Sequence, residues 1–372
     1  MLPSTTWPDF RAWRPLALAA AVGLCLSACA YLGTSASPLT SANSETASEQ
    51  PSAESTASPS PDATPVDGSV AAGLALIRPV DGIGQVFVID PDGSARQVSG
   101  LGEHAPVSAL LPLWSPDRTQ VAFRPGLFAG AAPQLWVVKA DGSRQRALGP
   151  VGANISWSGN SKTLLYEDSG QTVDTTGEPQ RLWLLDVATG EARVIGRGTS
   201  PQWMPDGRRI SYRPIPPGTI QDEALPFVIT RLPRGEPRQF AVARGAWWSP
   251  DGGSLLLQQA DGLHLAEADG SNARLLVEGF APVWSPDGTR VVYEYDVTPE
   301  EALPIIGVVD LDGNVLWSEV VGSEPAWSPD GTKLAVEVGF PDASIAILDA
   351  TTGEVIWELE GSDPAWAFET AP

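Results

Sequence analysis

Few side chains in this sequence have both the type and the spacing that catalysis or metal binding needs. His104 and His264 are the only histidines, and the only cysteines, Cys25 and Cys29, lie together in an N-terminal apolar segment. A zinc site takes several His and Cys ligands, so these four residues do not build one. His104 would act as a general base only beside a nucleophile, and the sequence contains no Gly-x-Ser-x-Gly elbow. We therefore expect neither a metal nor a cofactor, and no catalytic residue.

Carboxylates recur inside a repeated pentapeptide. Trp-Ser-Pro-Asp-Gly occurs at residues 248–252, 284–288 and 327–331, altered copies occur at 114–118, 157–161 and 203–207, and only the tryptophan remains at Trp366. Neighbouring copies lie 36 to 46 residues apart. One aspartate per copy predicts carboxylates that cap the local turn and lie too far apart to work as an acid–base pair. The segments 90–93 and 310–313 look like fragments of calcium loops, but they lack the further ligands and the closing Glu that calcium needs.

The segments that carry these residues are predicted to be short strands. A strand ends at the tryptophan, Ser-Pro-Asp-Gly forms a tight turn, and a β-branched or aromatic run follows, as at 290–293. A fourth strand, as at 315–317, closes the unit. The third strands end at aligned residues: Asp90, Lys139, Asp186, Thr230, Glu267, Asp310 and Asp349. Four antiparallel strands in about 40 residues are typical of a β-propeller blade.

The order of the strands predicts how the ring closes. The first third strand, at 86–90, has no tryptophan strand before it, and the last tryptophan strand, at 363–367, has nothing after it. The simplest solution is that the C-terminal strand completes the first blade, which also removes exposed sheet edges. The sequence therefore predicts an all-β, seven-bladed propeller over residues 71–368, with residues 369–372 as a tail. Six or eight blades are the alternative counts.

The repeated pattern resembles a known family. Trp-Ser-Pro-Asp-Gly, a strand, and then Ile/Val-x-Val-Asp-x-Asp-Gly resemble the WD-repeat-like propeller units of TolB-type periplasmic proteins, over residues 73–367. This resemblance implies the fold more closely than the function, because such propellers serve as binding platforms, as sensors and as lids on peptidases. Residues 30–70 are too polar and too short to form the separate N-terminal α/β domain that TolB carries.

The N-terminus has the features of an export signal. Arg11 and Arg14 precede an apolar run at 16–27, which is too short to span a bilayer comfortably. Residues 26–29, Leu-Ser-Ala-Cys, resemble the bacterial lipobox, which implies cleavage before Cys29 and a lipid on its sulfur. We expect a signal peptide at 1–28 and a disordered Ser/Thr/Pro/Ala tether at 29–70. The lipid bilayer is then a partner through Cys29, at the outer face of the cytoplasmic membrane or at the periplasm and outer membrane; an ordinary secreted protein is the alternative.

The net charge narrows the classes of partner. A formal charge of −22 repels the phosphate backbone of nucleic acids, so we expect no nucleic-acid partner. If charge steers association, it favours cationic partners. We expect a monomer.

One face of the predicted ring varies more than the other. Connections from second to third strands share a face, and they are long at 124–133, 168–180, 213–226 and 296–304 but almost absent at 258–262. Variable loops on a rigid scaffold are where function usually lies. We therefore select as candidate binding residues the charged side chains that follow second strands: Arg124, Glu167, Arg213, Glu294 and Glu337.

Trp247 is a further candidate. It adjoins Trp248, so one ring of the pair must face the opposite side of the strand, toward the channel or the next blade. The repeated tryptophans themselves are expected to pack between blades. His264 takes a position that other repeats fill with very different side chains, which indicates packing.

These observations favour a membrane-anchored, extracytoplasmic, non-enzymatic binding platform. Its partner, a protein, peptide or envelope polymer, would bind the loop-rich face. One alternative is a hydrolase that acts on glycans with carboxylates at the channel mouth, which would need two carboxylates in one cleft. Another is a small-ligand sensor, which would need a deep apolar channel.

Overall fold

The computed structural model describes residues 68–101, 109–125, 134–150, 154–167, 181–214, 225–232, 238–295, 304–339 and 343–367. The predicted lipidation site Cys29, His104 and most of the long connections named above lie outside the described residues. The described part is all-β apart from a short 3-10 helix, η2 (Gly68–Ala71).

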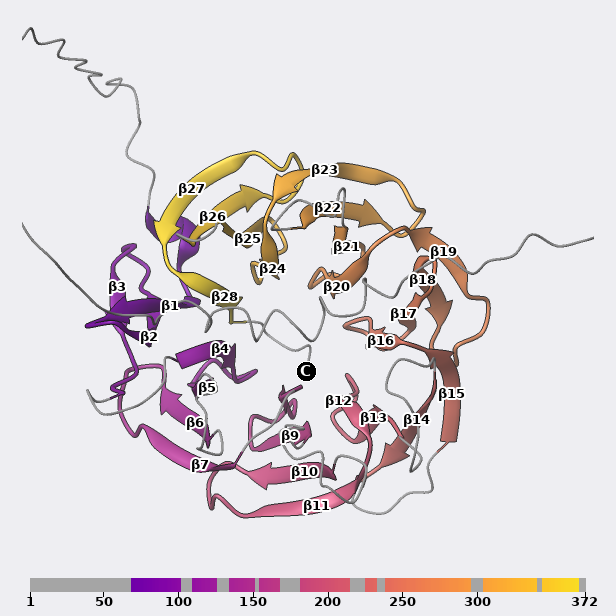
Figure 1. Cartoon of the computed structure of the whole chain (residues 1–372), viewed down its shortest axis with the longest axis horizontal. Coiled ribbons are helices and arrows are strands. Elements are labelled where there is room, and N and C mark those ends of the chain that lie inside the picture. Colours follow the sequence, from indigo (N-terminus) through magenta and orange to yellow (C-terminus); the bar gives the residue numbers. More distant parts are fainter. Residues whose placement is uncertain are drawn as a thin grey trace, which may run out of the picture. The chain divides into compact units, whose positions relative to one another are not determined.

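Seven four-stranded antiparallel sheets surround a common centre, as the blades of a propeller (Figure 1). From the centre outward, blade 1 contains β28 (Ser362–Trp366), β1 (Leu74–Val80), β2 (Ile83–Ile89) and β3 (Ala95–Gln97). Blade 2 contains β4 (Ala109–Trp114), β5 (Gln120–Pro125), β6 (Gln134–Lys139) and β7 (Arg146–Pro150). Blade 3 contains β8 (Ser156–Trp157), β9 (Thr163–Glu167), β10 (Arg181–Asp186) and β11 (Ala192–Arg197).

The remaining blades follow the same order. Blade 4 contains β12 (Thr199–Trp203), β13 (Arg209–Arg213), β14 (Leu225–Arg231) and β15 (Arg238–Ala243). Blade 5 contains β16 (Gly245–Trp248), β17 (Ser254–Gln259), β18 (Gly262–Glu267) and β19 (Arg274–Val277). Blade 6 contains β20 (Phe280–Trp284), β21 (Arg290–Tyr295), β22 (Ile305–Asp310) and β23 (Val315–Val321). Blade 7 contains β24 (Ser323–Trp327), β25 (Lys333–Val338), β26 (Ser344–Asp349) and β27 (Val355–Glu360).

The ring closes as the sequence predicts. The last strand, β28, pairs antiparallel with β1, and Leu74 lies opposite Trp366 while Ala75 lies opposite Ala365. Because β28 is the innermost strand of blade 1, the two ends of the propeller share one sheet (Figure 1). The prediction of seven four-stranded blades is therefore confirmed.

The repeated aspartates cap their own turns. In blade 6 the Ser285 hydroxyl donates to Asp287 at 2.6 Å, and the Thr289 amide donates to the same carboxylate oxygen at 3.0 Å. The Ser285 carbonyl accepts the Gly288 amide at 2.9 Å, which closes the β-turn. The same arrangement recurs in blades 2, 5 and 7, at Asp117, Asp251 and Asp330.

Four of the repeated tryptophans bond the preceding blade through their indole Nε1: Trp157, Trp248, Trp284 and Trp327. Trp327 is fully buried, and its indole Nε1 donates to the Val283 carbonyl of blade 6 at 3.0 Å. Trp157 bonds Leu113 of blade 2 in the same way, at 3.1 Å. The guanidinium of Arg290 lies over the Trp327 ring, 4.9 Å from its centre. These contacts confirm that the rings pack between blades.

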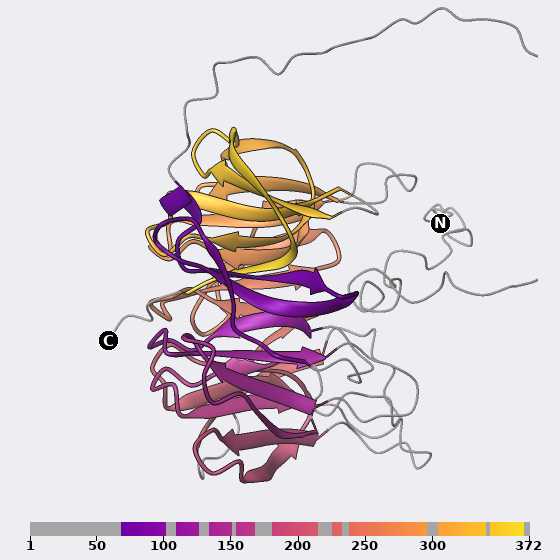
Figure 2. The ribbon, with the colours of Figure 1, turned by 90° about the vertical axis from the view of Figure 1, so that its left-hand side faces the viewer.

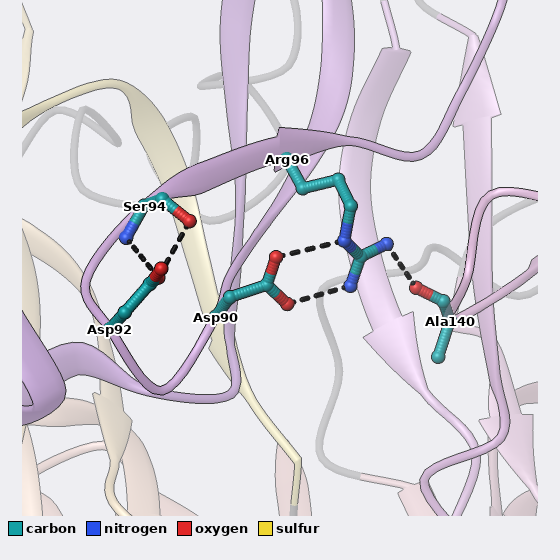
Figure 3. Close-up of polar contacts among 5 residues, drawn as sticks. All are labelled: Asp90, Asp92, Ser94, Arg96 and Ala140. Carbon is teal, nitrogen blue, oxygen red and sulfur yellow. Dashed lines mark hydrogen bonds and ion pairs between the residues drawn. The ribbon is translucent and has the colours of Figure 1, made fainter.

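A second set of contacts joins the blades farther out. Arg96 on β3 forms a two-pronged pair with Asp90, with both contacts at 2.8 Å, and its Nη1 donates to the Ala140 carbonyl of blade 2 at 2.8 Å (Figure 3). Asp92, in the calcium-like segment, accepts two bonds from Ser94. Asp92 thus stabilises its own turn, whereas Asp90 holds the arginine that crosses the seam, the boundary between two neighbouring blades. We call the fourth-strand arginines that reach the next blade, Arg96, Arg146 and Arg274, the outer-seam arginines.

Most innermost strands contain a left-handed residue followed by proline, and blade 3, where Ile155 follows Asn154, is an exception. In β24 the pairing shifts between Ser323 and Ala326, and Glu324 there has φ of 51°. Pro325 follows, and proline suits a bulge because it has no amide hydrogen to leave unpaired. Left-handed φ values occur three residues before each repeated tryptophan except in blade 5: at Leu111, Asn154, Ser200, Ala281, Glu324 and Asp363. In blade 5, β16 has no proline and pairs without a shift.

The register of blade 4 differs from the sequence alignment. Arg209 lies opposite Arg231, and Ile210 lies opposite Thr230. In blade 6 the corresponding pair is Arg290 and Asp310. Arg231, and not Thr230 as predicted, therefore takes the position at which five other blades carry Asp or Glu.

Candidate functional site

The two faces of the ring follow from the antiparallel topology. We call turn face the side that carries the β-turns between first and second strands, such as residues 285–288. We call loop face the opposite side, at which second strands end and third strands begin. Figure 2, a side view, shows the strands of each blade running between the two faces.

The five charged candidates occupy one register position on the second strands, at the loop face. Arg124 pairs with Leu110, Arg213 with Thr199, and Glu337 with Ser323, so each lies opposite the residue before the left-handed bulge position. The ladders place two further residues at this position, Ile77 in blade 1 and Gln258 in blade 5. We call the six polar members the polar ring: Arg124, Glu167, Arg213, Gln258, Glu294 and Glu337.

The carboxylates of the polar ring hold the bulge of the next blade. Glu167 accepts the Ser200 amide at 2.6 Å, Glu294 accepts the Glu324 amide at 3.2 Å, and Glu337 accepts the Asp363 amide at 2.9 Å. A left-handed φ costs a non-glycine residue about 1–3 kcal/mol, which surrounding contacts must offset. Each carboxylate therefore fixes a strained turn of chain across a seam between blades.

Two other members of the polar ring also bond the next blade. Arg213 donates to the Arg244 carbonyl at 3.1 Å, at the start of blade 5, and Gln258 donates to the Gly279 carbonyl at 3.1 Å, at the start of blade 6. Burial lowers the pKa of Arg213, and the nearby Glu167 opposes that shift. Arg124, Glu167 and Glu294 are buried. The structure thus places four of the sequence candidates in contacts between blades, at the loop-face ends of the second strands: Glu167, Arg213, Glu294 and Glu337.

Trp247 faces the next blade and not the channel. Its ring packs against the hydrophobic cluster that contains Trp284 and Tyr293 of blade 6. The ring also covers Gly245, where a Cβ atom would lie 2.2 Å from a ring carbon. The Trp247 carbonyl accepts the Trp284 indole at 3.2 Å. His264 is partly buried, and its Nε2 contacts Asp261 at 2.9 Å.

Ring closure gathers three carboxyl groups that the sequence analysis did not connect. Burial, followed by the charges of Glu337 and Glu324, raises the pKa of Asp363 to about 7. The Ser362 hydroxyl, 3.3 Å away, and the Leu111 amide oppose that rise. The pKa of Glu324 is raised by the loss of solvation and by Glu337. Its side chain still reaches solvent, so closely surrounding protein atoms reduce its solvation without covering it.

A small apolar cavity adjoins this cluster. It has a volume of about 240 Å³ and is lined by the innermost strands of blades 1, 2, 6 and 7, including Leu113, Val283, Ala326 and Ala365. Pro325 and Pro364, which directly follow Glu324 and Asp363, are part of the lining. The indole Nε1 of Trp114, another lining residue, is buried and has no hydrogen-bond partner among the described residues.

The arrangement limits the chemistry available. Within the ranges that the structure describes, no group of three or more His, Cys, Asp or Glu side chains is placed to hold a metal ion. In the same ranges, no helix is long and apolar enough to cross a membrane. A carboxyl group with a pKa of about 7, as in Asp363, can hold a proton at neutral pH. Its contacts also make it a structural part of the seam between blades 7 and 1.

Comparison with known proteins agrees with the fold. No family model matches the chain. The Tol-Pal system protein TolB of Nitrosomonas europaea is 29% identical over 229 residues, which cover 54% of this chain and 50% of that protein. The chain thus spans about half the length of this curated relative. Its propeller is TolB-like, in agreement with the resemblance found in the sequence.

Solved structures of propeller-containing peptidases also align. Prolyl oligopeptidase B of Galerina marginata aligns with a TM-score of 0.55 and 13% identity, over 79% of this chain and 51% of that one. A puromycin-hydrolysing peptidase of Mycobacterium tuberculosis aligns with a TM-score of 0.53 and 16% identity, over 82% and 55%. At such low identity these likenesses show the fold alone.

Proposed function

We propose that this protein is a non-enzymatic binding platform of the bacterial envelope, whose loop face binds a protein, peptide or envelope polymer. The observation that carries the proposal is the polar ring. It fixes five consecutive seams, from blade 3 to blade 1, at the ends of the second strands. A rigid rim of this kind fixes the strand ends from which the connections start, which reduces the entropy lost when a partner binds.

The location of the platform rests on the N-terminal sequence and on the relative. Residues 26–29 match a lipobox, and the TolB relative is named as a part of the Tol-Pal system. We propose that the chain is exported, cleaved before Cys29 and anchored by lipid on that residue. Cys29→Ser is expected to move the protein from the membrane fraction to the soluble extracytoplasmic fraction.

Capture of partners by the anchored chain tests the platform. We expect one reproducible partner after crosslinking in cells and purification of the full-length protein. Shortening 168–180 and 215–224 together should remove that partner, because both connections join second to third strands at the loop face. The matched control shortens 233–237, which join β14 to β15, because those two strands meet at the turn face. Loss of the partner only in the control would contradict the choice of face.

The acidic cluster favours a second candidate function. Asp363 directly precedes Pro364, which lines the cavity, and it has a pKa of about 7. The charges of two further carboxylates, Glu324 and Glu337, act on it, and a glycan hydrolase would need such a pair. Release of nitrophenol from a panel of aryl glycosides tests this function. Turnover that Asp363→Asn abolishes would establish the hydrolase and contradict a purely binding role. Absence of turnover across the panel would remove this candidate and leave the platform.

A further inference from the structure

A hollow on the turn face lies between blades 3 and 4, away from the polar ring. It has a volume of about 370 Å³, and its walls include Leu184 and Arg193 of blade 3 and Trp203, Arg208 and Arg231 of blade 4. Gly207 and Leu232 complete it. The floor is apolar and aromatic, whereas the charged residues of the lining are all arginines.

The seam between blades 6 and 7 contains a side chain that this seam lacks. Between blades 6 and 7, the Arg290 guanidinium lies over Trp327 and donates to the Gly331 carbonyl at 2.7 Å. The ladders place Thr163 at the position of Arg290, because Thr163 pairs with Asp186 as Arg290 pairs with Asp310. Threonine is too short to cover the neighbouring ring, so Trp203 lacks the arginine that covers Trp327.

The turn of blade 3 widens the same gap. In blade 5, Gly252 packs against Pro205 of the preceding turn, and a Cβ atom at Gly252 would lie 3.5 Å from that proline ring; Gly288 packs against Pro250 likewise. Blade 3 has Gly159 where those turns have proline. As a result, a Cβ atom at Gly207 would have nothing within 4 Å of it. The indole Nε1 of Trp203 is buried and has no partner among the described residues.

The arginines of the hollow differ from the outer-seam arginines. By register Arg193 is equivalent to Arg96, since Arg193 pairs with Leu184 as Arg96 pairs with Val88. Arg96 is held by Asp90 and by a carbonyl of the next blade (Figure 3). No hydrogen bond or ion pair joins the guanidinium of Arg193, Arg208 or Arg231 to another residue that the structure describes. Arg231 moreover stands opposite a second arginine, Arg209.

Basic residues are concentrated in the part of the sequence that forms this hollow. Residues 181–244 contain ten basic and six acidic residues, whereas the rest of the chain contains 13 basic and 39 acidic residues. A cluster of exposed arginines repels itself unless an anion or a carboxylate lies near it. In so acidic a protein, three such arginines around one hollow are therefore a specific feature of blades 3 and 4.

We propose that this hollow binds a phosphate monoester carried on an apolar body. Three guanidinium groups match a dianion with three terminal oxygens better than they match a single carboxylate, because arginine bonds phosphate through paired N–H donors. The Trp203 ring, Leu184 and Leu232 would receive the apolar part. The monoester can come from a soluble phosphate ester or from a lipid headgroup such as phosphatidate.

Calorimetric titration of the full-length protein tests the site. Phenyl phosphate is expected to bind more tightly than inorganic phosphate, because only the former fills the apolar floor. Arg231→Gln should weaken phenyl phosphate binding about 10-fold, the factor expected for one charge-assisted hydrogen bond. Arg144→Gln removes the same charge from an exposed position in blade 2 and should leave the affinity unchanged.

Flotation with phosphatidate vesicles, compared with phosphatidylcholine vesicles, distinguishes a lipid headgroup from a soluble phosphate ester as the source of the monoester.

A variant that fills the hollow separates binding from folding. Thr163→Arg with Gly159→Pro reproduces Arg290 and Pro286 of blade 6 at the equivalent positions of blade 3, and proline at this turn position is expected to raise stability by a small amount. We expect this double variant to melt at or above the wild-type temperature and to lose phenyl phosphate binding. Unchanged affinity in both this variant and Arg231→Gln would overturn the proposal, as would absence of heat with phenyl phosphate or binding of arginine methyl ester in its place.

Discussion

At the scale of single residues, the main result is that ring closure changes the chemistry of Asp363. It lies 26 residues after Glu337 and 39 after Glu324 in the sequence. Its pKa rises to about 7 first because it is buried when β28 joins blade 1, and second because Glu337 and Glu324 then lie near it. Nothing in the local sequence marks this residue. The cluster was therefore not predicted from the sequence, although Glu337 was selected as a candidate because it follows a second strand.

The raised pKa of Asp363 predicts a dependence of stability on pH. The folded protein binds this proton more tightly than the unfolded chain, in which the pKa is close to 3.8. The stabilisation is complete below pH 3.8 and is lost as the pH rises through about 7. We expect Asp363→Asn to flatten the fall in melting temperature between pH 5 and pH 8.

Glu337→Gln is the companion variant for this measurement. It retains an oxygen that can accept the Asp363 amide, yet it removes the negative charge that helps to raise the pKa of Asp363. The fall in melting temperature should then shift to lower pH. A profile that neither substitution alters would show that Asp363 does not titrate in this range.

The buried Glu294 tests the role of the polar ring. Glu294→Ala leaves the Glu324 amide without its acceptor, which is expected to cost about 1–3 kcal/mol in the free energy of unfolding. Glu294→Gln keeps an acceptor and should cost less. Urea denaturation measures both values. Equal stability of the wild type and the alanine variant would mean that this contact does not hold the seam.

At the scale of elements, the sequence predicted the blades well because the hydrogen bonds of each repeated turn join residues only a few positions apart in the sequence. Burial alone would raise the pKa of Asp330, but hydrogen bonds from Ser328 and Thr332 outweigh it and lower the pKa to about 2. This group adds stability above pH 3.8, and that stability is lost as the pH falls to about 2.

Substitution of Asp330 should show this local contribution. Asp330→Ala is expected to lower the free energy of unfolding by about 1 kcal/mol, because the turn is largely exposed and water screens the lost contacts. The matched control is Asp312→Ala, in an exposed turn of blade 6. Chemical denaturation at pH 7 and at pH 3 compares the two. A larger loss for Asp312→Ala at pH 7 would contradict the assignment.

Other features of the elements could not be predicted. The bulges depend on pairing across β24 and β25, and on equivalent strands elsewhere, so proline gave only a hint of them. The register of blade 4 was placed one residue out because Thr230 and Arg231 are both compatible with a strand end. Gln258 was missed because it is uncharged, although its side chain holds a seam as the charged members do.

At the scale of the whole molecule, the loop face has a fixed rim and the turn face has an opened seam between blades 3 and 4. The sequence predicted the number of blades and their closure from the offset between tryptophan strands and third strands. It could not predict the hollow, because that space depends on contacts that are missing between blades 3 and 4, where Thr163 and Gly159 take the positions of Arg290 and Pro286 in blade 6.

Site-specific photocrosslinking in cells tests the central claim, binding at the loop face, most directly. A photoreactive amino acid is placed at Asp81 or Asp261, in exposed turns that join second to third strands, or at Thr289 or Thr332, in exposed turns of the turn face. We predict that the first pair forms a discrete adduct with one partner and that the second pair does not. Adducts from Thr289 and Thr332 alone would contradict the proposed face, and absence of adducts from all four positions would contradict the platform itself.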